Sequence, residues 1–211
     1  MFKCVECTLH GCSSRDMEKT MKCCPCKEEA IQAKAKELYG EEENHKIAYH
    51  AALVESEGYG ILCRVEEIML FCDKAGYKKL GLVFCMGLRE EAKTLNKILT
   101  HNGFDIASVV CKNGAIPKSF IGLKAEHTLS GCTEEVMCNP IAQALLMNEE
   151  KTELNILLGL CVGHDTLALK YLEAPTTILA VKDRVTGHNP LAAIYLAGGY
   201  YKKRFFKSKK A

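Results

Sequence analysis

The residues LGLVFCMGLREEAKTLNKILTHNGFDIASVVC, from Leu80 to Cys111, read as a strand, a helix and a second strand. The two ends of this stretch are short apolar runs of strand length. Between them, Ala92, Leu95 and Leu99 recur at helical spacing, and Gly103 stands just past the end of that pattern. One strand–helix–strand unit of this kind is the building block of a parallel sheet.

The same alternation continues toward the C-terminus. A third strand is predicted from Leu154 to Cys161 and a fourth from Thr177 to Val181. Asn139-Pro140 and Asn189-Pro190 are expected to open helices, because Asn caps well and Pro is favoured at the first helical position. Further helices are predicted to end at Gly76, after Val65, Ile68, Met69 and Cys72, and to start near Asp165, and the last helix is expected from Leu191 to Ala197. A long loop with Gly114, Pro117, Gly122 and Gly131 is expected after the second strand. The pattern predicts an α/β fold with a doubly wound, mainly parallel sheet of four strands or slightly more.

The chain divides into four predicted segments. Residues 1–27 form a cysteine-rich knuckle, 28–60 a helical connector, 61–201 the α/β domain and 202–211 a basic tail. Two helical patterns, KEEAIQAKAKELY and ENHKIAYHAALVE, make up the connector. The knuckle has too few apolar residues to fold alone, so a metal is expected to order it.

Composition narrows the class of protein. The chain has 211 residues, of which 48% are hydrophobic and 26% charged, and this balance excludes a disordered chain. The formal net charge of +2 gives no broad field for steering onto nucleic acid or a membrane. The first residues, MFKCVECTLHGC, lack the features of a signal peptide, so a cytoplasmic location is expected. In that reducing compartment thirteen cysteines indicate metal ligation or thiol chemistry rather than disulfides.

Four cysteines are expected to converge at one edge of the sheet. Cys85, Cys111 and Cys161 end the first three strands, and Cys138 directly precedes an Asn-Pro helix start. With the strand order 2-1-3-4, a crevice opens between the strands that end in Cys85 and Cys161. Nearby helix N-termini are expected to lower the pKa values of the thiols and so favour metal binding. We predict one iron–sulfur cluster here, of the 4Fe–4S type; the alternative is that each cysteine only packs beneath a helix.

A second set of cysteines lies in the knuckle. Cys4, Cys7 and Cys12 follow the spacing Cys-x2-Cys-x4-Cys and supply three ligands. Cys24 is the expected fourth ligand because a Cys-Pro ending recurs in iron–sulfur ligand runs. Cys26 competes with it for that role. Zinc accepts the same four thiolates, so the knuckle holds either a second iron–sulfur cluster or a structural zinc ion.

Candidate catalytic residues leave the same edge of the sheet as the first four cysteines. His164 and Asp165 follow the third strand, while Lys182 and His188 follow the fourth. They suit a proton donor, a substrate clamp or hydrogen-bond partners of metal ligands. The alternative is that they are helix caps and a charged loop.

Several segments together resemble the prokaryotic family called domain of unknown function 1847. They are the cysteine-rich head, NHKIAYHAALVESEGYG, RVEEIMLFC, FCMGL, MCNPIAQALLMNE, GLCVGHD and VKDRVTGHNPLAA. Members of that family are labelled predicted metal-binding proteins, so the resemblance implies metal binding and supplies no reaction. By residue it extends to Cys4, Cys7, Cys12, Cys24, Cys85, Cys111, Cys138, Cys161, His164, Asp165, Lys182, Asp183 and His188.

Three functional hypotheses stay open. The first is an iron–sulfur protein for electron transfer or small-molecule chemistry, of the kind expected in an anaerobe. The second is a zinc protein with an α/β binding module. The third is a metal-free thiol enzyme with Cys85 or Cys161 as nucleophile and His164 as base. The expected partner is a small-molecule substrate or a redox partner protein, with a homodimer left open, and neither nucleic acid nor a membrane.

Overall fold

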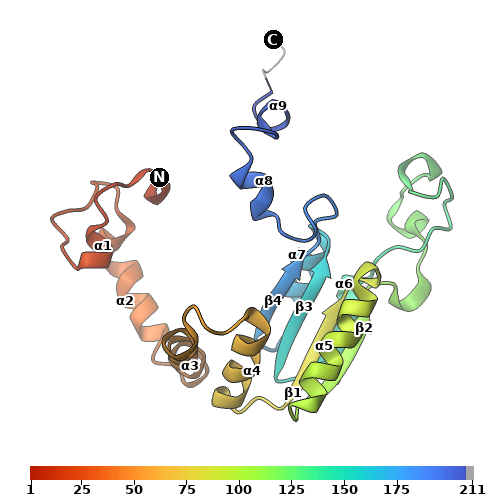
Figure 1. The fold of residues 1–211 in the computed structure, drawn as a ribbon, viewed down its shortest axis with the longest axis horizontal. Coiled ribbons are helices and arrows are strands. Elements are labelled where there is room, and N and C mark those ends of the chain that lie inside the picture. Colours follow the sequence, from red (N-terminus) through yellow and green to blue (C-terminus); the bar gives the residue numbers. More distant parts are fainter. Residues whose placement is uncertain (208–211) are drawn as a thin grey trace. The chain divides into compact units, whose positions relative to one another are not determined.

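A computed structural model of the protein describes residues 1–207. The chain forms two compact units that divide after Ile61, and each is described by itself. The second unit is an α/β fold built on one sheet of four parallel strands (Figure 1). The strands run in the order β2-β1-β3-β4, which confirms the predicted fold class and strand order. Their bounds are β1 Lys79–Phe84, β2 Asp105–Val110, β3 Leu154–Leu160 and β4 Thr176–Val181.

The predicted strand ends differ from the observed ones by one residue. Cys85, Cys111 and Cys161 were each expected as the last residue of a strand and instead lie directly after it. The hydrogen bonding of the sheet still reaches two of them, because Cys85 N–H donates to Leu158 O at 3.1 Å and Cys111 N–H donates to Phe84 O at 2.9 Å. The cysteines therefore stand where the backbone leaves the sheet and turns.

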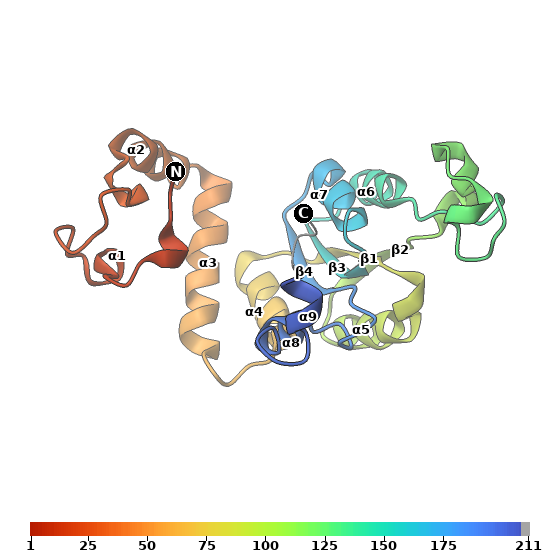
Figure 2. The ribbon, with the colours of Figure 1, turned by 90° about the horizontal axis from the view of Figure 1, so that it is seen from above.

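Helices cover both faces of the sheet, as a doubly wound fold requires (Figure 2). One face carries α4, Arg64–Ala75, and α5, Arg89–His101. The other carries α6, Pro140–Glu149, and α7, His164–Tyr171. Each face encloses its own hydrophobic core. The larger core, toward α4 and α5, includes Cys72, Leu80, Leu82, Leu95, Leu99 and Ile156, and the smaller one Val83, Cys85, Cys111, Met147, Leu157 and Leu160.

A bulge at Gly159 sets the direction in which β3 ends. The pairing of β3 with β4 shifts its register around Leu158, and Gly159 has a φ of +67°. A Cβ atom at Gly159 would come within 1.9 Å of Leu88 Cδ1. Because the extra residue changes the alternation, Leu160 faces the same core as Leu157. Only glycine meets both the backbone and the space requirement here.

The predicted helix ends agree with the structure at two of the clearest signals. Asn139 caps α6, because its Oδ1 atom accepts a hydrogen bond from Ala142 N–H at 3.1 Å. Gly76 ends α4 in the left-handed conformation with φ +73°. Cys63 caps the start of α4 in a reciprocal bond pattern with Glu66, so this cysteine has a structural role.

The C-terminal segment is more helical than predicted. The helix α8, Leu191–Tyr195, is two residues shorter than expected, and α9, Lys202–Phe205, was not predicted. The basic-aromatic sequence around α9 predicts a solvated tail, but the ring of Phe205 stacks on the buried Tyr201, with ring centroids 5.2 Å apart. Residues 208–211 of the predicted basic tail lie outside the described residues. Within residues 1–207, we find no helix with the length and apolar character that a membrane span needs.

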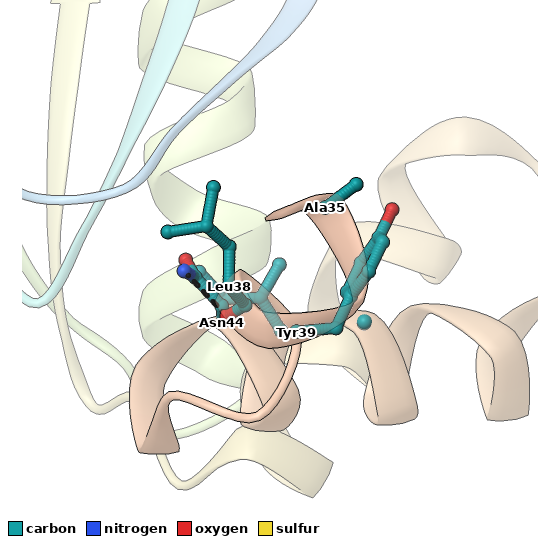
Figure 3. Close-up of a pocket in the computed structure, with 6 residues that line it drawn as sticks. Ala35, Leu38, Tyr39 and Asn44 are labelled. Carbon is teal, nitrogen blue, oxygen red and sulfur yellow. Dashed lines mark hydrogen bonds between the residues drawn. The ribbon is translucent and has the colours of Figure 1, made fainter. Parts of the chain in front are cut away.

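The first unit contains two longer helices and little buried surface. The helices α2, Glu29–Leu38, and α3, Glu42–Gly58, confirm the two predicted helical patterns. Before them, residues 1–28 form short turns and the single-turn α1, Gly11–Ser14. A cavity of about 400 Å³ lies where α2 meets α3 (Figure 3), and there Asn44 Nδ2 donates to Leu38 O at 3.0 Å. This cavity is lined by Ala35, Leu38, Tyr39, Asn44, Ile47 and Ala48.

Candidate metal centre

A cavity of about 1080 Å³ lies beyond the carboxyl ends of the strands, where parallel sheets bind their ligands. The connections that follow β1, β2, β3 and β4 line it, together with the first turns of α6 and α7. Seven of the eight residues predicted at this edge line the cavity: Cys85, Cys111, Cys138, Cys161, His164, Lys182 and His188. The eighth, Asp165, is not among the lining residues, and its Oδ1 atom accepts from Thr166 N–H at 2.7 Å.

Backbone hydrogen bonds hold three of the cysteine-bearing turns together. Asn139 N–H donates to Cys111 O at 2.7 Å, which brings the start of α6 to the end of β2. Met86 N–H, just after Cys85, donates to Cys111 Sγ at 3.3 Å. These bonds link residues that are far apart in the chain, so the sheet fixes the relative positions of three thiols.

The three thiols form a chain of hydrogen bonds in which Cys85 donates to Cys111 and Cys111 donates to Cys138. The bond from Cys111, helped by the charge of Lys112, lowers the pKa of Cys138 to about 7 despite its burial. The bond to Cys111 raises the pKa of Cys85, because donating a proton stabilises the neutral thiol. The bond to Cys138 and burial likewise raise the pKa of Cys111, and they outweigh the lowering by Cys85. The expectation that helix N-termini would lower all these pKa values is therefore wrong for Cys85 and Cys111.

The fourth thiol has a different partner. Arg184 Nη2 donates to Cys161 Sγ at 3.4 Å, and this contact raises the pKa of the Arg184 guanidinium. The charge of Cys161 also acts on Cys138 and opposes the lowering of its pKa. Cys161 thus belongs to the same electrostatic group as the linked thiols but is held from the β4 side of the crevice.

Lys182 reaches the floor of the cavity across two glycines. A Cβ atom at Gly87 would lie 3.3 Å from Lys182 Nζ and 3.9 Å from Cys85 Sγ, and one at Gly159 would lie 3.7 Å from Lys182 Nζ. The missing side chains leave room for the ammonium group beside Cys85. Its charge opposes the rise in the pKa of Cys85.

A hydrogen-bonded turn presents His188 to the cavity. Asp183 Oδ1 accepts from Val185 N–H at 2.9 Å and from Thr186 N–H at 3.0 Å. Bonds from Thr186, through its side chain and its N–H, lower the pKa of Asp183 and keep it ionised. Asp183 N–H in turn donates to His188 Nδ1 at 3.1 Å. Asp183 is therefore a positioning residue for His188.

His164 begins α7 at the wall of the cavity, and its N–H donates to Cys161 O at 2.9 Å. Burial lowers the pKa of its imidazole, so the neutral ring is favoured at neutral pH. A neutral imidazole can accept a proton or bind a metal.

Sequence reasoning missed Gln143, which is fully buried on α6. Its Nε2 atom donates to Phe84 O at 3.1 Å and to Val109 O at 2.8 Å, and so ties the ends of β1 and β2 beneath the thiols. Its Oε1 atom has no hydrogen-bond partner among residues 1–207. The only signal in the sequence is a polar residue four positions after the helix cap Asn139.

The connection between β2 and α6, residues 112–138, forms a lobe that was predicted only as a long loop (Figure 1). An antiparallel bridge between Pro117 and Val136 and an ion pair between Lys118 and Glu135 close its base. This ion pair lowers the pKa of Glu135 to about 2. Apolar lobe residues form part of the cavity wall, namely Ile116, Phe120, Ile121, Leu123, Leu129 and Met137.

Two other cysteines of the α/β unit lie apart from this cavity, and the described side chains do not form a ready-made metal site. Cys72 is fully buried in the larger core, and burial raises its pKa to about 12. Cys132 is exposed on the lobe. Across residues 1–207, no group of three or more His, Cys, Asp or Glu side chains is arranged so that it could hold a metal ion.

In the knuckle, residues 1–27, Cys26 interacts with three of the predicted metal ligands. Its side chain shares a hydrogen bond with Cys24, and the charges of Cys12 and Cys4 act on it, so that its pKa is raised. Cys7 is set apart by backbone bonds from His10 and Leu9, which lower its pKa. Cys26 therefore lies among the predicted ligands rather than outside them.

The comparisons with known proteins agree with the resemblance seen in the sequence. A 46% identical relative, an uncharacterized protein of Methanocaldococcus jannaschii, aligns over 184 residues, which are 87% of this chain and 92% of the relative. No solved structure matches the chain. The family model described as "Protein of unknown function (DUF1847)" matches residues 23–179, and thus includes the four cysteines at the sheet edge but neither Cys4 nor Lys182. The chain belongs to this DUF1847 family of proteins of unknown function.

Proposed function

We propose that this protein binds an iron–sulfur cluster through Cys85, Cys111, Cys138 and Cys161, and that the cluster serves redox or small-molecule chemistry. The observation that carries the proposal is that four thiols from four separate connections line one cavity at the switch point of a parallel sheet. Cysteines used only for packing have no reason to meet at a ligand site.

The chemistry of the donor set fits an anionic, thiolate-ligated centre. Cys138 has a pKa of about 7, and Cys85 and Cys161 lie close to cationic groups that stabilise thiolates. Lys182 adjoins Cys85, and Arg184 bonds to Cys161. These cations offset the negative charge that accumulates when several thiolates bind iron.

Four thiolates can hold either an iron–sulfur cluster or a zinc ion. Among residues 1–207, no group of three or more metal-ligating side chains is arranged to hold a metal as it stands. Loading still requires the thiols to turn toward the bound group. When bound, such a cluster supplies a redox centre if four cysteines ligate it, or an open Lewis-acid iron if three do.

For the knuckle we propose a second, structural metal held by Cys4, Cys7, Cys12 and Cys24, with Cys26 as a fifth thiol close by. Zinc remains the alternative to iron–sulfur there, because a closed set of four thiolates suits both.

Protein purified without air tests the cluster proposal. We expect a brown protein with iron and acid-labile sulfide in similar amounts. Cys161→Ala should lose the absorbance and iron of the sheet-edge cluster, whereas the matched controls Cys63→Ala and Cys72→Ala should keep both. A colourless protein that carries only zinc would contradict the proposal, as would a Cys161→Ala variant with its full iron content.

A metal-free thiol activity is a second candidate, favoured by the hydrogen-bonded chain from Cys85 through Cys111 to Cys138. Its nucleophile would be Cys138 rather than Cys85, because the pKa of Cys138 is lowered and that of Cys85 is raised. Protein free of iron and zinc that reacts with one equivalent of an alkylating agent at Cys138 would favour this candidate.

A further inference from the structure

The large cavity has two ends of different chemistry. Its floor carries the cysteines together with Lys182 and Arg184. Its outer wall is the apolar surface of the lobe, residues 112–138. A volume of about 1080 Å³ is at the upper end of ligand pockets in proteins and exceeds what a metal centre alone would fill.

The cations at the floor lack acidic partners. The two acidic residues of the cavity wall are occupied, since Glu135 pairs with Lys118 and Asp183 accepts from the backbone of its own turn. Lys182 makes no ion pair with any residue in the part of the chain that the structure describes. The guanidinium of Arg184 uses one donor on Cys161 and keeps others available.

The apolar wall is exposed to an unusual degree. Phe120 and Leu129 are 74% and 95% exposed, although both line the cavity. The Pro117–Val136 bridge and the Lys118–Glu135 ion pair close the base of the lobe that carries both side chains. Large apolar side chains that line a cavity without covering it mark a surface that a ligand buries.

The geometry points to a binding site for a small amphipathic anion, in which Lys182 and Arg184 hold a carboxylate or phosphate group and Phe120 and Leu129 cover an apolar body. The site lies in the same cavity as the proposed cluster but does not depend on its metal. It defines the substrate class as organic acids or phosphate monoesters that carry an apolar chain or ring.

Calorimetry with four simple probes tests the site on the whole protein as isolated. Octanoate and octyl phosphate carry both features, octanamide lacks the charge, and acetate lacks the apolar chain. We expect octanoate or octyl phosphate to bind about tenfold more tightly than octanamide, because a charge-assisted hydrogen bond is worth at least one such factor. Acetate should bind more weakly still. The better of the two anions identifies the head group.

Two variants separate the charge from the apolar wall. Lys182→Gln should remove most of the preference for octanoate over octanamide, while Lys97→Gln, which changes an exposed cation on α5, should preserve it. Phe120→Ser should weaken octanoate and octanamide alike, and the control Phe206→Ser, at an exposed phenylalanine outside the cavity, should weaken neither. Phe120 is exposed, so its replacement leaves the fold intact.

The inference would be overturned if neither octanoate nor octyl phosphate binds more tightly than octanamide, or if none of the four probes shows saturable binding. So would a Lys182→Gln variant that keeps the full preference while its circular dichroism matches the parent protein. Iron content is measured on the same samples. If protein without iron binds octanoate or octyl phosphate selectively, this inference holds and the cluster proposal fails. If iron-loaded protein binds neither anion selectively, the cluster proposal holds and this inference fails.

Discussion

The two groups of cysteines in this protein obtain their order from different sources. At the sheet edge, Cys85 and Cys111 continue the hydrogen bonding of β1 and β2 above a buried core. In the knuckle, only Gly11 and Cys24 are buried, and the hydrogen bonds are local, such as Cys7 N–H to Cys4 O at 3.1 Å. The fold therefore prepares the first group of thiols, whereas the second must be ordered by what it binds.

Loss of knuckle metal should have the largest effect. Replacing Cys4 and Cys7 by Ser should unfold residues 1–27, because a structural metal contributes on the order of 10 kcal/mol to the folding free energy of small thiolate sites. The α/β unit should keep its fold, since its core contains no knuckle residue. Limited proteolysis with mass spectrometry locates the new cleavage sites. An unchanged cleavage pattern in residues 1–27 would show that the metal does not order the knuckle.

Gly159→Ala should be the most damaging single change in the α/β unit. The new Cβ would meet Leu88 at 1.9 Å, and the backbone at φ +67° is strained for alanine. Together these effects should cost about 3 kcal/mol of unfolding free energy, measured by urea denaturation. The matched control is Gly122→Ala, where φ is +79° but no atom lies within 4 Å of the new Cβ. Equal losses in the two variants would show that strain alone decides the outcome.

Gln143→Leu tests whether the fold prepares the thiols through this amide. The variant leaves Phe84 O and Val109 O without the donor that now joins them, at a cost of about 2 kcal/mol. Cluster loading should fall by more than this loss of stability explains, because the ends of β1 and β2 carry Cys85 and Cys111. Asn102→Leu removes an exposed helix-end bond to Ile98 O and should change neither urea stability nor iron content.

The smallest expected effect concerns the pKa of Cys138 in metal-free protein. Because its folded pKa is about 7, below the ordinary value of 9.0, its thiolate should form as pH rises through 7. Cys111→Ala removes the donated bond, so alkylation of Cys138 at pH 7 should slow about tenfold. Cys72, with a pKa of about 12, is the unreactive reference. Mass spectrometry of iodoacetamide-treated protein gives both rates, and an unchanged Cys138 rate would mean that Cys111 is not its donor.

The sequence predicts this fold well because its signals are local. Apolar runs, the Asn139-Pro140 helix start and Gly76 each depend on neighbours within a few residues, and the structure confirms them. Right-handed crossovers restrict the topology to a doubly wound sheet or a close relative. With the order 2-1-3-4, which the structure has, Cys85 and Cys161 lie at the same edge.

The parts of the site that escaped prediction depend on distant partners. Gln143 donates hydrogen bonds to Val109 and Phe84, which are 34 and 59 positions earlier in the chain. No local sequence pattern could therefore predict its role. The largest cause of the raised pKa of Cys85 is its hydrogen bond with Cys111, which follows a different strand. A prediction based on helix N-termini does not take such a contact into account. Ligation by the predicted cysteines, and the roles of His164, Asp165, Lys182 and His188, stay predictions.

The lobe also bears on how members of this family could diverge. Its chain leaves the sheet at Cys111 and returns at Asn139, and the hydrogen bond between these residues spans 2.7 Å. Segments whose two ends meet in this way tolerate insertion, deletion and replacement, because a change in their length does not displace the sheet. A different segment could be grafted between Cys111 and Cys138 without moving the four cysteines of the cavity. Evolution, or a protein engineer, can therefore exchange the wall that meets a substrate's apolar part while the thiols and cations beneath it are inherited unchanged.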